Sequence, residues 1–177
     1  DQVTPEKLEL IRTEIRRQLG DWPETLFERF DPVPIAAASI AQVHRARTHD
    51  GHEVVLKIRR PGIVKTLHTE LEMLHDLAGL LKKRRLTPDT FDPVRMVREF
   101  SDAVAKEVDF ANERRNQQRF LRNFADDATI HVPQVFEEYC AEGILTMEYI
   151  DGIKPNQIDL LEQAGRDTKL IAKRGAD

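Results

Sequence analysis

Cysteine is nearly absent from this chain, because Cys140 stands alone among 177 residues and can form no internal disulfide. We therefore expect a reducing compartment. No apolar run approaches the roughly 20 residues needed to span a bilayer, and no signal peptide is visible at the start. The net charge of −4 gives no support to nucleic-acid binding. The six histidines show no ligand spacing with Cys140, so the sequence predicts no metal site.

Basic residues cluster in two places, at Arg59-Arg60 and at Lys82-Lys83-Arg84-Arg85. The simpler interpretation of the second cluster is the polar end of a helix. The alternative is a contact with anionic lipid headgroups. The chain has no repeat and no low-complexity linker, so one domain is the default at this length.

The stretch PIAAASIAQVHRARTHDGHEVVLKIRRPG, residues 34–62, is the most informative part of the sequence. Two runs rich in β-branched residues flank His49-Asp50-Gly51, a hairpin turn signal. The second run holds Lys57 inside an apolar strand, where an ammonium group is costly to bury without a counter-charge. The small residues Ala36-Ala37-Ala38-Ser39 would let a polyphosphate approach the backbone. This layout is that of a kinase nucleotide lobe, with alanines in place of the usual glycines.

Several segments then resemble one family, in order and in spacing: AAASIAQVHRA, VVLKIRRPGI, KEVDFANERRNQQRF, VPQVFEEYC and ILTMEYIDG. The chain is similar to the UbiB family of atypical kinase-like ATPases, which support quinone biosynthesis, and to its bacterial members in particular. The resemblance covers nearly all of the chain. It implies ATP or ADP with Mg as the cofactor of the full-length protein.

The resemblance implies two catalytic residues. Lys57 would hold the α- and β-phosphates, and Glu113 would be its partner, the family's helix-C glutamate. The alternative for Lys57 is an edge-strand lysine that reaches water, and for Glu113 a pairing with the neighbouring arginines. The phosphate loop would be formed by Ala36, Ala37, Ala38 and Ser39. Its Cβ atoms restrict the backbone, so we expect a stiff loop with altered nucleotide preference; the alternative is a plain tight turn.

The segment Met147-Glu148-Tyr149-Ile150 resembles a gatekeeper and hinge. Adenine would bind the carbonyl of Glu148 and the N–H of Ile150, with Met147 behind the ring.

Glu107 and Asp109 match the family's Glu-x-Asp motif. Asp109 and Glu113 are spaced to share one helical face, where Lys57 would supply a cation. Glu107 falls in an apolar stripe with Phe100 and Phe110, so it needs a partner if it is buried. In the family that partner is a Lys-x-Gly-Gln motif on an N-terminal extension, which is expected upstream of Asp1.

The expected fold is α+β, a protein-kinase-like N-terminal lobe with a five-stranded antiparallel sheet and an expanded set of helices. The expected helices are 5–19, with Thr4 as N-cap, 62–83, 92–122 with a break or bend, and 156–174; the expected strands are 27–35, 40–47, 53–60, 134–139 and 144–149. We expect residues 1–30 to be an N-terminal helical segment, 31–151 the kinase-like N-lobe, and 152–177 the truncated start of the C-lobe helices.

After Gly152 no catalytic-loop aspartate, metal-binding asparagine or Asp-Phe-Gly motif occurs. We therefore expect the nucleotide lobe of a UbiB-like kinase or ATPase, inactive alone, which binds nucleotide weakly or not at all. The alternatives are a non-catalytic nucleotide- or partner-binding module and a purely helical scaffold. The expected partners are adenine nucleotide, the remainder of the kinase fold, and quinone-biosynthesis proteins or a lipid surface, with no nucleic acid. The expected location is cytoplasmic, peripheral to the inner membrane in the full-length protein.

Overall fold

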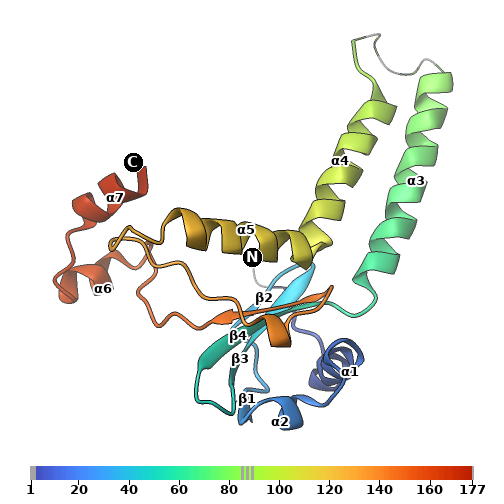
Figure 1. Ribbon diagram of the computed structural model, residues 1–177. Helices are drawn as coiled ribbons and strands as arrows, with labels where there is room; N and C mark the ends of the chain where they lie inside the picture. Colours follow the sequence, from blue (N-terminus) through green and yellow to red (C-terminus); the bar gives the residue numbers. More distant parts are fainter. Residues whose placement is uncertain (1–2, 85, 87, 89, 177) are drawn as a thin grey trace.

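An antiparallel sheet lies at the centre of the computed structural model, which describes residues 3–84, 86, 88 and 90–176 (Figure 1). Its five strands are β1 (Arg29–Phe30), β2 (Ala36–Ala37), β3 (Ala41–Arg47), β4 (Glu53–Arg59) and β5 (Ile144–Glu148). The strand order is β1-β3-β4-β5, and β2 also pairs with β3. The predicted α+β fold with a five-stranded antiparallel sheet is confirmed.

Helices lie on both sides of the sheet and beyond it (Figure 1). They are α1 (Leu8–Leu19), α2 (Pro23–Leu26), α3 (Ile63–Lys83), α4 (Pro93–Val108), α5 (Phe110–Asn123), α6 (Ile158–Gln163) and α7 (Thr168–Ala176), with a short 3-10 helix, η1 (Glu137–Tyr139). The helices α3 and α4 form a hairpin that projects away from the sheet. No helix among the described residues is long and apolar enough to cross a membrane.

Side chains of one strand alternate between two faces of the sheet. Ile144 packs with Ile11 and Ile15 of α1, whereas Leu145 packs with Ala41 and Phe110 on the opposite side. We call these sides the α1 face and the Lys57 face, because Lys57 pairs with Leu145 in the β4–β5 register. The α1 face holds the larger apolar core, to which β4 contributes Val54, Leu56 and Ile58.

Two expected strands differ from the structure. In 27–35 only Arg29–Phe30 joins the sheet, because Pro32 and Pro34 have no N–H to donate to a ladder. In 134–139 only Val135 bridges β5, and the chain then tightens into η1. The number of strands is nevertheless as predicted, because Ala36 and Ala37 of the predicted phosphate loop form β2.

Some helix ends were also mispredicted. Thr4 does not cap α1, which begins at Leu8 without a side-chain cap. The segment before the helix forms other hydrogen bonds instead. The Glu6 N–H donates to Gln42, and the Thr4 carbonyl accepts from Arg60. The expected helix 156–174 is two helices, α6 and α7, separated by a turn in which Gly165 has a φ of 67°. The predicted stop at Gly20 and the helix start after Asp92 are confirmed.

A chain of buried polar groups runs along the α1 face. The Gln42 amide contacts His44 Nε2 at 2.7 Å, and His44 Nδ1 lies 2.9 Å from the Asp31 carbonyl oxygen. His44 is fully buried. Burial lowers the pKa of His44, more than the contact with Asp31 raises it.

Replacing Ile15 tests the attachment of α1 to the sheet. Its side chain is 0% exposed, so Ile15→Ala is expected to lower the free energy of unfolding by about 2–4 kcal/mol. Leu10 on the same helix is 47% exposed, and Leu10→Ala should change the free energy of unfolding by less than about 0.5 kcal/mol. Urea denaturation measures both, and equal effects would contradict the assigned core.

Burial of neutral His44 predicts a pH dependence. An unfolded histidine takes up a proton below about pH 6.5, while the folded His44 resists it, so the free energy of unfolding should fall as the pH drops below that value. His44→Leu removes this proton uptake and should flatten the profile between about pH 5 and 6.5. Denaturant titrations at several pH values compare the two proteins, and parallel profiles would contradict the argument.

Candidate functional site

Lys57 and Glu113 form the ion pair at the centre of the site. Lys57 Nζ lies 2.6 Å from Glu113 Oε2, so the predicted proximity is confirmed. The two side chains are 27% and 39% exposed, so the pair is partly open to solvent. The Lys57 ammonium also lies 4.7 Å from the centroid of the buried Phe110 ring, which is attractive for a cation. Lys57 is therefore held between a helix carboxylate and an aromatic face.

The start of α5 places Glu113 in position. The helix α4 ends at Val108 and α5 begins at Phe110, with Asp109 as the N-cap between them. The Asp109 carboxylate accepts a hydrogen bond from the Asn112 N–H at 3.2 Å. A carboxylate at a helix N-terminus satisfies orphan N–H groups and the helix dipole. Glu113 thus lies in the first turn of a capped helix, from which it reaches Lys57 on β4.

Arg59 fixes this junction from the sheet. Its guanidinium is buried and donates to the Val108 carbonyl at 2.9 Å and to Glu142 at 2.9 Å. The Val108 carbonyl belongs to the last turn of α4, where intrahelical partners run out. The cation therefore connects the end of β4 to the end of α4. Sequence reasoning treated Arg59 only as part of a basic cluster and missed this role.

The Ala-rich segment is a tight turn next to β3. Ala36 and Ala37 pair with Val43 and Gln42, and the Ala38 N–H donates to the Ala41 carbonyl at 2.8 Å. Ser39 lies at the tip of this turn. The turn joins the strand next to β4, so the structure brings it and Lys57 to the same sheet.

The predicted hinge segment, residues 147–150, begins in the last two residues of β5 and continues beyond it. Met147 pairs with Val55 in the register that places it on the Lys57 face. The Tyr149 N–H donates to the Glu53 carbonyl at 2.9 Å, so in the alternating antiparallel pattern the Glu148 carbonyl points away from β4. The Ile150 N–H has no hydrogen bond to any described residue. Both backbone groups predicted to bind adenine therefore remain available.

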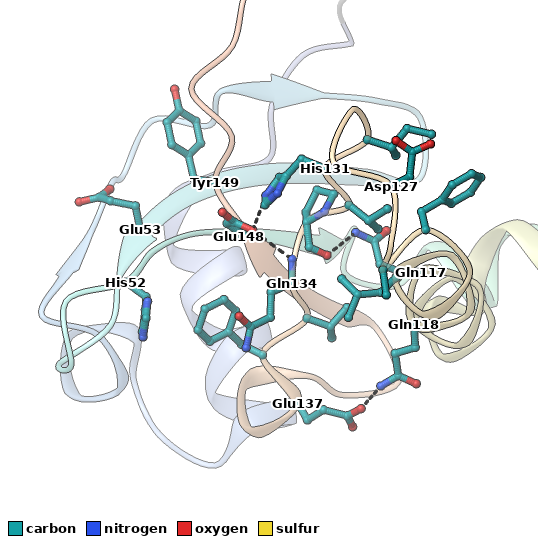
Figure 2. Close-up of a pocket in the computed structure, with 18 of the residues that line it drawn as sticks. His52, Glu53, Gln117, Gln118, Asp127, His131, Gln134, Glu137, Glu148 and Tyr149 are labelled. Atoms are coloured by element: carbon teal, nitrogen blue, oxygen red, sulfur yellow. Dashed lines mark hydrogen bonds and ion pairs between the residues drawn. The ribbon is translucent and has the colours of Figure 1, made fainter. Parts of the chain in front are cut away.

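The side chain of Glu148 has its own partners at this edge (Figure 2). It accepts from His131 Nε2 at 2.9 Å and from the Gln134 N–H at 3.2 Å. These contacts tie the hinge to the loop that follows α5. Sequence reasoning considered His131 only as a metal ligand, and no spacing signal connects it to Glu148.

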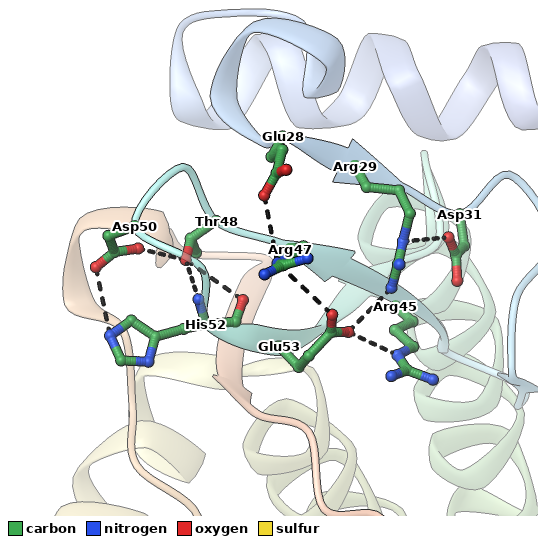
Figure 3. A network of polar contacts seen from close by, with 9 residues as sticks. All are labelled: Glu28, Arg29, Asp31, Arg45, Arg47, Thr48, Asp50, His52 and Glu53. Atoms are coloured by element: carbon green, nitrogen blue, oxygen red, sulfur yellow. Dashed lines mark hydrogen bonds and ion pairs between the residues drawn. The ribbon is translucent and has the colours of Figure 1, made fainter.

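Tyr149 is supported from the other side by the β3–β4 hairpin. The Arg45 guanidinium lies 4.0 Å from the Tyr149 ring centroid, and it also donates to Glu53 at 2.9 Å (Figure 3). Glu53 further accepts from Arg29 at 3.0 Å. This charged network lies at the β3–β4 hairpin and contacts Tyr149, directly after the end of β5.

Comparisons with known proteins agree on one family. Residues 1–177 match the ABC1 atypical kinase-like domain. The chain belongs to the ABC1 atypical kinase-like family.

Two curated relatives of this family are named "Probable protein kinase UbiB", from Cronobacter sakazakii and Aeromonas hydrophila. The first is 38% identical to this chain over 99% of its length, and the second is 37% identical over 100% of its length. The chain spans only 32% and 33% of these relatives' lengths. The predicted resemblance to UbiB proteins is thereby confirmed.

A solved structure has the same fold. It is the complex of Rv3197 with erythromycin from Mycobacterium tuberculosis, with a TM-score of 0.73 and 30% identity over 87% of this chain and 38% of that one.

The Glu-x-Asp motif of this ABC1-family chain differs from the sequence-based expectation. Asp109 and Glu113 do not share one continuous helix face, because Asp109 caps α5 from outside the helix. Glu107 is exposed on the last turn of α4 rather than buried between phenylalanines, because Phe100 is itself 53% exposed. Within the described residues Glu107 has no ion-pair partner.

A hollow of about 550 Å³ adjoins the ion pair. Lys57, Glu107 and Glu113 line it together with Asn116 and His131. A second, larger hollow of about 980 Å³ lies between α5, the β3–β4 hairpin and the hinge, and Figure 2 shows its lining. The first hollow is lined by Lys57, the predicted phosphate-binding lysine, and by the carboxylates of Glu107 and Glu113. It is therefore the candidate functional site.

Substitution of the two motif carboxylates is expected to separate their roles. Asp109→Ala removes the cap of α5 and should lower the free energy of unfolding by about 1 kcal/mol. Asp109→Asn should retain most of the stability, because asparagine also caps helices. Glu107→Ala should change it by less than about 0.5 kcal/mol, because the side chain is exposed. Thermal or urea unfolding tests this, and a larger loss for Glu107→Ala would contradict the assignment.

Proposed function

We propose that this chain is the nucleotide-binding lobe of a UbiB-like atypical kinase or ATPase. The observation that carries the proposal is the 2.6 Å ion pair between Lys57 and Glu113, on the sheet face reached from the Ala-rich turn and the hinge. In kinases a strand lysine paired with a helix glutamate holds the α- and β-phosphates of ATP.

The available polar groups fit an adenine nucleotide. The Lys57 ammonium has three N–H donors, and Glu113 is its one side-chain hydrogen-bond partner among the described residues. The Ile150 N–H and the Glu148 carbonyl offer the donor and acceptor that an adenine edge requires. The hollow beside Lys57 has room for phosphates.

The fit to magnesium is only partial within this chain. Among the described residues no group of three or more His, Cys, Asp or Glu side chains gathers to hold a metal. Glu107 and Glu113 are the two carboxylates that line the hollow beside Lys57. Magnesium would neutralise the β- and γ-phosphates when bound. We assign the remaining ligands to the longer protein, and we expect hydrolysis there and only weak nucleotide binding by residues 1–177.

Exposed apolar side chains lie at the end of the hinge and just beyond it, at Ile150, Ile153 and Ile158. They support a contact with the remainder of the kinase fold. A role in ubiquinone biosynthesis, together with its protein or lipid partners and a peripheral position at the inner membrane, rests on the resemblance to UbiB proteins.

Lys57→Ala tests the proposal in the full-length protein. It removes the phosphate-binding cation, so the Kd for Mg-ATP and Mg-ADP should rise at least about tenfold, and phosphate release should fall to background. Isothermal titration and a phosphate-release assay measure the two effects. Lys65→Ala is the matched control, because Lys65 is an exposed lysine on α3.

Unchanged nucleotide binding by Lys57→Ala would contradict the proposed function. Binding that Lys57→Ala weakens, without hydrolysis by the unsubstituted protein, would instead favour a non-catalytic nucleotide-binding module.

A further inference from the structure

Arg60 holds the Ala-rich turn. Its side-chain Nε donates to the Ala38 carbonyl at 2.9 Å, and its backbone N–H donates to the Ile40 carbonyl at 2.8 Å. The carbonyls of Ala38 and Ile40, on either side of Ser39 at the turn tip, are thus both bound by one residue, which directly follows β4. The turn has little freedom to move relative to the strand that carries Lys57.

Arg60 is in turn held by the leading segment, residues 3–7. Its Nη1 lies 2.7 Å from Glu6 Oε1, and its Nη2 donates to the Thr4 carbonyl at 2.8 Å. The side chain is 10% exposed. All three guanidinium nitrogens therefore have partners, one in the turn and two in the leading segment, which fixes the plane of the fork.

The direction of these bonds determines where the turn presents its N–H groups. The Glu6 N–H donates to Gln42 Oε1, and Gln42 is paired with Ile58 on the α1 face. Arg60 therefore binds the Ala38 carbonyl from the α1 face. In a trans peptide the C=O and the following N–H point in opposite directions, so the Ser39 N–H points away from the Arg60 guanidinium. It has no hydrogen bond to any described residue.

We propose that Arg60 is a positioning residue that orients the Ser39 N–H toward a phosphate group of the nucleotide bound at Lys57, and that residues 4–6 fix Arg60 in this role. The inference rests on the proposed nucleotide-binding function. A backbone N–H oriented in advance binds an anion without paying for reorganisation of the turn. Phosphate affinity would then depend on the segment that precedes α1.

The competing explanation is that Arg60 only anchors the leading segment. Loss of Arg60 would then reduce stability without a specific effect on phosphate. Comparing Mg-ADP with adenosine separates the two explanations, because adenosine contacts the hinge and carries no phosphate. Backbone exchange at residues 38–41 reports the turn directly.

The experiment measures Kd values for Mg-ADP and adenosine with the full-length protein, together with amide hydrogen exchange. Arg60→Met keeps the aliphatic stem and removes every donor of the guanidinium. It is expected to raise the Kd for Mg-ADP roughly five- to tenfold, to leave the Kd for adenosine within about twofold, and to accelerate exchange in the turn. Arg95→Met is the control, because Arg95 is an exposed arginine whose side chain pairs, among the described residues, only with Glu99 on α4.

Arg60→Lys adds a second test, since it retains the charge. One ammonium cannot reproduce the planar fork that binds Ala38, Glu6 and Thr4 together, so Arg60→Lys is expected to resemble Arg60→Met. Full recovery by lysine would overturn the positioning role, as would an unchanged Kd for Mg-ADP in Arg60→Met or an equal loss for both ligands. If the unsubstituted protein binds neither ligand, the proposed function fails and this inference with it. A Kd for Mg-ADP that rises in Lys57→Ala but stays unchanged in Arg60→Met would overturn the inference alone.

Discussion

The ion pair between Lys57 and Glu113 is the interaction on which the rest of this structure depends. A lysine in the middle of a β-strand, against the Phe110 ring, requires a carboxylate. Glu113 meets this requirement only because α5 begins where it does. The Asp109 cap sets that beginning, and Arg59 holds the end of α4 that precedes it. Strand, junction and helix thus form one unit around the amine.

Two adjacent arginines serve the two faces of the sheet. Successive side chains of a strand point in opposite directions, so Arg59 reaches the α4–α5 junction while Arg60 reaches the Ala-rich turn. The α4–α5 junction that positions Glu113 and the Ala-rich turn next to β3 are therefore both fixed from the end of β4. This explains how a loop of alanines keeps a defined shape next to the site without the conformational freedom of glycine.

The sequence predicted the elements whose signals are local. The His49-Asp50-Gly51 turn, the lysine strand and the helix start after Asp92 follow from turn chemistry and capping. The Lys57–Glu113 proximity followed from the family resemblance. Contacts between distant segments were not predictable: nothing in the sequence connects Arg60 to Thr4, or His131 to Glu148. Whether Glu107 is buried was left open by the sequence, because helical periodicity alone cannot show that α4 stands away from the sheet, with Phe100 exposed.

A structure of the full-length protein with Mg-ADP bound tests the account most directly. The account predicts that the α- or β-phosphate lies within hydrogen-bonding distance of Lys57 Nζ, that adenine contacts the backbone of Glu148 and Ile150, and that the Lys57–Glu113 pair is retained. A nucleotide bound elsewhere, with Lys57 and Glu113 paired only to each other and no ligand in the adjoining hollow, would contradict it.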